Sequence, residues 1–162
     1  PKTAIMAGAA FLLVPLLIGS WGLYYPLNLT YAATSLIIGI REEFVYRGVL
    51  QNIFEKRFGI CAALLLSNVC FVAMHWGSLP FTAFNTFQFA TAGTILGLIY
   101  YRSRNIWLVA ALHFTYDAIW SFTPILPVRL PIEFGYFLLA GICVTLVTSS
   151  VPASRSTNAS CE

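Results

Sequence analysis

The chain has 162 residues, of which 59% are hydrophobic and only 9% are charged, and its formal net charge is +3. About a quarter of the residues of a soluble domain are charged, so this chain has too few charges to cover a surface that faces water. With a mean hydropathy of +0.79, it is expected to be an all-α, polytopic membrane bundle. The small and scattered positive charge excludes nucleic acid as an expected partner.

Six apolar runs are long enough to cross a bilayer, which takes about 20 residues of helix. The predicted transmembrane helices cover about residues 4–24, 31–54, 60–76, 81–101, 106–122 and 132–151. Polar segments separate them, such as 55–59 after the second helix and 102–105 after the fourth. Residues 1–151 are therefore expected to form one membrane domain, followed by a polar, disordered tail at 152–162.

Basic residues fall almost entirely on one side of this six-helix arrangement. One side carries Lys2, Lys56, Arg57, Arg102, Arg104 and Arg155. The loops on the other side carry only Arg129. Because positive residues are retained on the cytoplasmic side, we expect both termini to face the cytoplasm. In an organellar membrane such as the thylakoid, they would face the equivalent side.

The second predicted helix carries charged residues within an apolar run. They are Arg41, Glu42, Glu43 and Arg47. A charge at the bilayer centre costs roughly 2.5–3.5 kcal/mol on insertion scales, so such residues indicate a functional site. Glu43 and Arg47 share a helix face, whereas Glu42 is rotated by about 100° from Glu43. An ion pair that locks the bundle explains Glu43 and Arg47 but leaves Glu42 available as a general base.

The only two histidines of the chain, His75 and His113, also lie within predicted transmembrane helices. A buried histidine in a soluble core is more often structural, but in a bilayer partners are fewer and desolvation is greater. Asp117 lies one turn after His113 on the same helix face. We interpret the charged cluster, the two histidines and Asp117 as one functional set.

Two weaker patterns lie in the fourth predicted helix. Asn85 and Gln88 are one turn apart, and they predict either interhelical hydrogen bonds or polar groups that line a substrate groove. Gly93 and Gly97 form a GxxxG pattern, which is typical of closely packed transmembrane helices.

Three motifs occur in order on successive predicted helices. Glu42, Glu43 and Arg47 match EExxxR, Phe71 and His75 match FxxxH, and His113 and Asp117 match HxxxN/D. With this combination the chain resembles the CPBP intramembrane protease family, also called the Abi or CAAX type II prenyl endopeptidase family, over about residues 31–122. The resemblance implies a helical bundle with a catalytic cavity inside the membrane.

The resemblance also implies a role for each motif residue. By position, Glu42 and His75 are expected to activate a water, Glu43 and Arg47 to support them, and His113 and Asp117 to face the oxyanion. Many relatives have Asn where this chain has Asp117. Ionised Asp accepts hydrogen bonds but donates none, so we expect Asp117 to orient His113 and keep it charged.

Metal dependence has two interpretations. We favour a metal-free reaction that requires no cofactor. Glu42, His75 and His113 nevertheless form a two-histidine, one-carboxylate set of the kind that binds catalytic zinc, so a divalent metal such as zinc is the alternative. The chain has no HExxH motif, and these ligands would have to converge from three helices.

The predicted helix limits place the site residues at unequal depths. At about 1.5 Å per residue, Glu42 lies roughly 18 Å from the cytoplasmic end of its helix, His75 roughly 22 Å and His113 roughly 10 Å. A shared site therefore requires tilted or kinked helices, or helix limits that differ from those predicted.

The sequence predicts an intramembrane endopeptidase whose partners are the lipid bilayer and a membrane-anchored protein or peptide substrate. Both a prenylated and an unprenylated substrate are compatible with this prediction. The alternative is a non-catalytic membrane subunit or assembly factor of a larger complex that retains the motifs. A proton- or ion-coupled transporter is disfavoured because the sequence shows neither inverted repeats nor a pair of broken helices.

Overall fold

The computed structural model describes residues 2–18, 27–77 and 82–122. Its elements are α1 (Lys2–Ile18), α2 (Leu27–Glu43), the π-helical segment η1 (Phe44–Gln51), α3 (Asn52–Met74), α4 (Ala83–Ser103) and α5 (Ile106–Phe122). The described part of the chain contains no strand, which confirms the all-α prediction there. The predicted sixth helix at 132–151 and the tail at 152–162 lie outside the described residues, so six spans are not confirmed.

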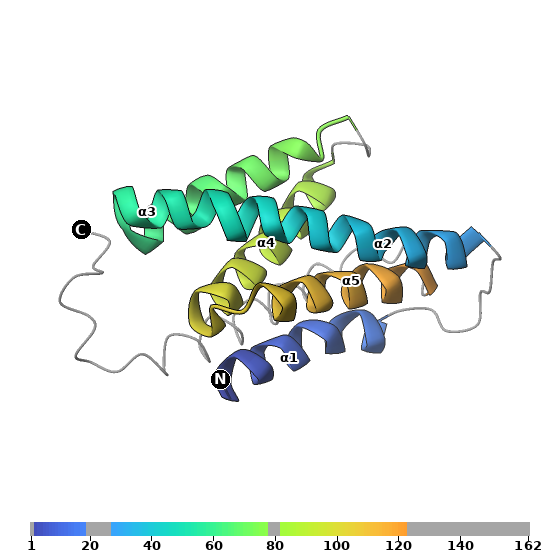
Figure 1. Cartoon of the computed structure of the whole chain (residues 1–162). Coiled ribbons are helices and arrows are strands. Elements are labelled where there is room, and N and C mark those ends of the chain that lie inside the picture. Colours follow the sequence, from blue (N-terminus) through green and yellow to red (C-terminus); the bar gives the residue numbers. More distant parts are fainter. Residues whose placement is uncertain (1, 19–26, 78–81, 123–162) are drawn as a thin grey trace.

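Helix α2, η1 and the first turns of α3 form one continuous helix that reverses direction at Gly59 (Figure 1). Gly59 has φ 81° and ψ 174°, a conformation that glycine adopts without steric cost. The predicted second helix, 31–54, was therefore too short. Residues 55–57 are Glu, Lys and Arg, which are good helix formers and extend the helix up to this turn.

One described helical stretch, Leu29–Met74, is long and apolar enough to cross a membrane by length and composition. Gly59 divides it into the two arms of a hairpin. Two shorter apolar helices, Ala4–Leu13 and Ile106–Ile119, lie outside it. Within the described ranges, the fifth predicted helix has the expected limits, and the fourth is shifted by two residues.

The turn between α4 and α5 is held by local caps and by a contact with the hairpin. Arg104 ends α4 in the left-handed region, with φ 51°. The Asn105 side-chain oxygen accepts hydrogen bonds from the backbone N–H groups of Trp107 and Leu108 at 3.1 Å each and thereby caps α5. The Arg104 guanidinium donates two hydrogen bonds to the Glu55 carboxylate on α3. These bonds fix the start of α5 beside the base of the hairpin.

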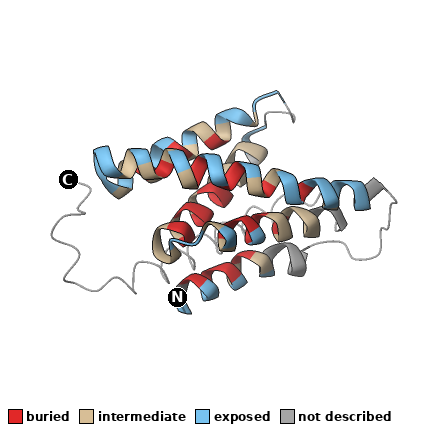
Figure 2. Cartoon of the chain, in the orientation of Figure 1, coloured by how far each residue is buried: buried red, intermediate tan, exposed pale blue. Residues whose placement is uncertain are grey.

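The apolar core lies between α1, α4 and α5, where side chains are buried on the inward faces (Figure 2). Its buried members are Ala4, Ala7, Phe11, Ala92, Ile95, Leu96, Ile99, Tyr100, Val109, Leu112 and Tyr116. The outward faces of α2, η1 and α3 carry exposed large apolar side chains, including Ile37, Val49, Leu65 and Val69. Such faces suit contact with lipid rather than with water.

Glycines allow the closest helix contacts around the site. A Cβ on Gly39 would lie 3.1 Å from the backbone nitrogen of Phe114, so α2 approaches the backbone of α5 there. A Cβ on Gly93 would lie 2.1 Å from Asn68 Oδ1, and one on Gly97 would lie 2.9 Å from Leu64 Cδ2. The close packing predicted from the GxxxG pattern is therefore confirmed, with α3 as the partner of α4.

Candidate active site

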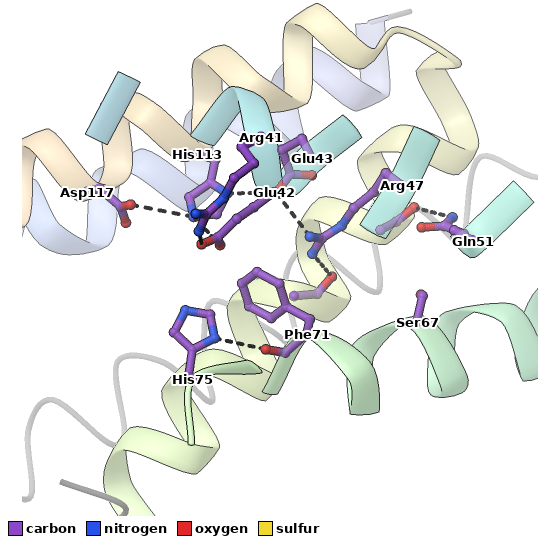
Figure 3. Close-up of polar contacts among 12 residues, drawn as sticks. Arg41, Glu42, Glu43, Arg47, Gln51, Ser67, Phe71, His75, His113 and Asp117 are labelled. Carbon is purple, nitrogen blue, oxygen red and sulfur yellow. Dashed lines mark hydrogen bonds and ion pairs between the residues drawn. The ribbon is translucent and has the colours of Figure 1, made fainter. Parts of the chain in front are cut away.

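The two adjacent glutamates of the sequence motif have different surroundings at the junction of α2 and η1 (Figure 3). Glu43 is fully buried, and its Oε1 accepts a hydrogen bond from Arg47 Nη1 at 3.0 Å, as the spacing predicted. The same oxygen lies 2.7 Å from His113 Nδ1. Glu43 therefore connects the charged helix to α5 and has no direct route to the cavity described below.

Arg47 and Gln51 dock η1 onto the glycine face of α4. Arg47 Nη2 donates to the carbonyl of Gly93 at 2.8 Å, and Gln51 Nε2 donates to the carbonyl of Gly97 at 3.0 Å. Both donors and both acceptors are four residues apart, so the two helices meet in register. The Arg47 guanidinium also lies over the Phe71 ring, 4.7 Å from its centroid. Arg47 thus has a structural environment that satisfies its charge.

Glu42 differs because it is among the described residues that line the cavity, and Glu43 is not. In both glutamates Oε2 is buried without a hydrogen-bond partner among the described residues. The Glu42 side chain is only 3% exposed, and its Oε1 is 3.3 Å from Arg41 Nη2. Its Oε2 lies 4.0 Å from His113 Nε2. An ionised carboxylate oxygen without a partner is able to accept a hydrogen bond or a proton.

The His113 ring is held between carboxylates on both of its nitrogens. Because a carboxylate accepts, the Nδ1 atom beside Glu43 carries the hydrogen. Nε2 lies 3.5 Å from Asp117 Oδ2 as well as near Glu42. The orienting role that the sequence suggested for Asp117 therefore belongs, at Nδ1, to Glu43. No local pattern could indicate this contact, because 70 positions separate the two residues.

His75 lies on the opposite side of the site, across from Glu42 and His113 (Figure 3). Its Nδ1 is 2.8 Å from the carbonyl oxygen of Phe71, one turn earlier, so Nδ1 carries the hydrogen of the neutral ring. The ring stacks on Phe89 of α4 with centroids 4.2 Å apart. In this tautomer Nε2 is the basic nitrogen. The centroids of the Phe71 and His75 rings lie 4.8 Å apart, and this side-chain contact accounts for the pairing of the two residues in the motif.

The polar residues surround a cavity of about 650 Å³. Its described lining includes Glu42, His75, His113 and Asp117 together with Gln88, Arg41, Ser35 and Tyr31. Its apolar lining includes Phe11, Ile38, Phe71, Met74, Phe89, Ala92, Leu96 and Tyr116. Gln88 therefore lines the groove, as one of its two sequence interpretations proposed. Sequence reasoning assigned no cavity role to Phe11, Tyr31, Ser35 or Phe89.

The hairpin and the α4–α5 turn reduce the differences in depth expected from the sequence. With Gly59 as the turn, Glu42 and His75 lie 16 and 15 residues from Phe58 and Ile60. These separations correspond to about 24 and about 22 Å of helix. The start of α5 is level with Glu55 rather than with Gly59, because Arg104 binds Glu55. This offset adds about 6 Å to the roughly 10 Å along α5 and so brings His113 closer to the depth of Glu42 and His75.

The metal-ligand alternative does not fit the described geometry. No group of three or more His, Cys, Asp and Glu side chains in the described ranges is arranged to hold a metal ion. The set of Glu42, His75 and His113 lines one cavity, but it is not assembled as a coordination sphere. We therefore derive the chemistry from the side chains themselves.

Comparisons with known proteins agree with the motif pattern. A family model described as type II CAAX prenyl endopeptidase Rce1-like matches residues 24–119. The matched region includes α2, η1, α3 and α4 and nearly all of α5, and so contains every motif residue. No curated protein and no solved structure matches the chain.

Proposed function

Because the chain belongs to the type II CAAX prenyl endopeptidase Rce1-like family, a family of membrane-associated proteases, we propose that it is an intramembrane endopeptidase. In this proposal it hydrolyses a peptide bond of a membrane-anchored protein. Membership of a CAAX prenyl endopeptidase family favours a prenylated protein as the substrate. The reaction uses water activated by Glu42 and His75, without a required metal. The substrate, the mechanism and the activity of this chain are all parts of the proposal.

One observation carries the proposal. Glu42 Oε2 is buried, has no hydrogen bond among the described residues and lies 4.0 Å from His113 Nε2 at the wall of the cavity. A carboxylate oxygen buried without a partner costs stability unless a bound group satisfies it. A water between Glu42 and His113 would satisfy this oxygen and would be held where a substrate carbonyl can reach it.

The proposed reaction begins when Glu42 Oε2 accepts a proton from the bound water. The oxygen of this water forms a bond to the carbonyl carbon, and the carbonyl π electrons move onto its oxygen. The C–N bond then breaks as the carbonyl re-forms, and the proton held by Glu42 passes to the leaving nitrogen. His75, across the cavity, accepts a hydrogen bond from the same water and keeps it aimed at the substrate.

His113 is the proposed donor to the oxyanion of the tetrahedral intermediate. If all three carboxylates are ionised, Glu42, Glu43 and Asp117 carry one more charge than Arg41 and Arg47 balance. A protonated His113 removes this excess, which favours an Nε2–H aimed into the site. Glu43 holds Nδ1 and so fixes the ring before the negative charge develops. Asp117 then stabilises the imidazolium from the Nε2 side.

The orientation in the membrane also belongs to this proposal. The hairpin turn at 55–59 and the α4–α5 turn lie at one end of the molecule, joined through Glu55 and Arg104. Lys56 and Arg57 are exposed at this end, so it is expected to face the cytoplasm or its organellar equivalent. Both termini are expected on the same side. Protease protection of a tag placed after Glu162, in sealed membrane vesicles, tests this orientation.

The experiment for the function uses the full chain, purified in detergent and returned to lipid nanodiscs. A farnesylated CAAX peptide with a fluorophore and a quencher on either side of the cleaved region is the substrate, and its unprenylated form is the comparison. Glu42→Gln is expected to lower kcat by about 10²- to 10⁴-fold, which is the usual value of a general base.

Glu55→Gln is the matched control, because it makes the same change on the continuation of the same helix, outside the cavity. It is expected to retain activity near that of the unchanged chain. Absence of cleavage by the unchanged chain, with normal folding, would refute the proposed function and favour the non-catalytic subunit.

A further inference from the structure

Arg41 is the charged group of the cavity to which the proposed reaction gives no direct task. Its side chain is 63% exposed, and it is the only Lys or Arg among the described residues that line the cavity. Its one hydrogen bond within the described ranges joins Nη2 to Glu42 Oε1 at 3.3 Å. A guanidinium has five N–H donors, so this bond leaves most of them available.

Arg47, one and a half turns further along the same helix, has a structural role and serves as a comparison for Arg41. It is only 2% exposed, and it donates to Glu43 and to a backbone carbonyl of α4 while its guanidinium lies on an aromatic ring. Arg41, by contrast, is mostly exposed, and its hydrogen bond within the described ranges goes to the adjacent Glu42. Its exposure and open donors are those of a group that binds something entering the cavity.

We propose, on the basis of the peptidase function above, that Arg41 determines specificity by binding a carboxylate of the substrate next to the bond that is cleaved. The location follows from Glu42, whose two oxygens face different partners. Oε1 contacts Arg41, whereas Oε2 faces His113 and the proposed water. A carboxylate bound to Arg41 therefore lies within a few residues of the reacting carbonyl, since an extended chain covers about 3.3–3.6 Å per residue.

The negative charges that line the cavity increase the importance of Arg41 for binding a substrate carboxylate. Glu42 and Asp117 both line the cavity, so a substrate carboxylate entering without a cation beside it would be repelled. A guanidinium matches a carboxylate in a planar, two-bond arrangement, which an ammonium cannot reproduce. The bound carboxylate can come from the C-terminus of the substrate or from an acidic side chain near it, and the experiment distinguishes the two.

The test uses three farnesylated peptides of the same length that differ only at the C-terminal residue and its end group. The first ends in a free carboxylate, the second in a C-terminal amide, and the third in an amide that follows a glutamate. For each, kcat/KM and the dissociation constant are measured with the unchanged chain, Arg41→Gln, Arg41→Lys and the control Arg57→Gln. Arg57 is exposed at the other end of the hairpin and does not line the cavity.

For the unchanged chain and for Arg57→Gln, we expect a carboxylate to be preferred over the plain amide by roughly 10- to 100-fold, as for a charge-assisted hydrogen bond pair. In Arg41→Gln the ratio should fall to about one, and in Arg41→Lys it should be intermediate. Preference for the first peptide alone identifies the C-terminus as the source of the carboxylate. Equal preference for the first and third peptides shows that a side chain also serves.

The assignment of Arg41 is overturned if the unchanged chain does not discriminate between acid and amide, or if Arg41→Gln keeps the discrimination. Arg41 would then only neutralise Glu42. If no peptide is cleaved, the peptidase function fails, whereas the ratio of the dissociation constants still decides whether Arg41 recognises a carboxylate.

Discussion

The contact between α3 and α4 at Gly93 gives a sharp test of the packing that holds the site. A methyl group at Gly93 would lie 2.1 Å from Asn68 Oδ1 and 3.1 Å from Phe71 Cδ1. The Asn68 side chain cannot move freely, because its Nδ2 donates to the carbonyl of Ala90 and to Thr94 Oγ1 at 2.8 Å each. Gly93→Ala must therefore break these bonds or separate the helices.

The magnitude follows from these contacts. Two interhelical hydrogen bonds in a membrane protein are worth about 0.6 kcal/mol each, and overpacking a close contact costs about 1–3 kcal/mol. Gly93→Ala should thus lower the free energy of unfolding by about 2–4 kcal/mol. Gly48→Ala is the control, because its added methyl group would meet nothing closer than 3.8 Å. It should be neutral or stabilise by up to about 1 kcal/mol, since alanine is the better helix former.

Unfolding in mixed micelles, followed by tryptophan fluorescence, measures both variants and a third that tests the cause. With Asn68→Ala in the background, Gly93→Ala should cost clearly less than it does alone, since the clashing oxygen is gone. Equal stability of Gly93→Ala and Gly48→Ala would refute the helix contact described here. The same cost in both backgrounds would refute Asn68 as its cause.

Three further variants test other contacts by the same unfolding measurement. Arg47→Gln removes the arginine from the buried pair with Glu43 and should cost about 3–5 kcal/mol, whereas a cost under about 1 kcal/mol would contradict the described ion pair. Glu55→Gln removes a partly exposed pair and should cost less than about 1 kcal/mol, with a smaller effect in high salt. The hydrogen bond with Glu55 raises the pKa of Arg104 above its ordinary value, so the stability due to the arginine charge is present at neutral pH and decreases as the pH rises into strong alkali. Phe11→Ala empties a fully buried position stacked on Tyr116 and should cost about 3–5 kcal/mol, and an unchanged stability would contradict the position of α1.

Local features of the sequence predicted the parts of the fold that local physics determines. Polar breaks in apolar runs placed the helices, and the limits of 106–122 agree with α5 because Asn105 caps that helix. The four-residue spacing predicted the pairs Glu43–Arg47 and His113–Asp117, and both are present. The 100° rotation between neighbours correctly separated the surroundings of Glu42 from those of Glu43.

Contacts between distant segments could not be predicted in this way. The bond between Glu43 and His113 depends on how α2 packs against α5, which a period of 3.6 residues does not specify. The π-helical segment η1 also departs from this period, and such segments are common at functional sites. The helix continues to Gly59, whereas a polar run of Glu, Lys and Arg had indicated a loop from residue 55 onward.

The contribution of α1 to the site was not predicted for a related reason. Phe11, the residue of α1 among the described residues that line the cavity, is apolar and is buried against Tyr116 of α5. An apolar helix with no motif residue is predicted only as a span. Its place beside α4 and α5 emerges from packing alone.

A double-mutant cycle on kcat tests the central claim most directly, namely that Glu42 as general base and His113 as oxyanion donor act together in one reaction. Glu42→Gln and His113→Asn are compared singly and together, in the same nanodiscs and with the same prenylated peptide. Residues that act as a unit show strongly non-additive losses, so the double variant should be about as slow as the slower single variant. A double variant whose loss equals the product of the two single losses would contradict the account.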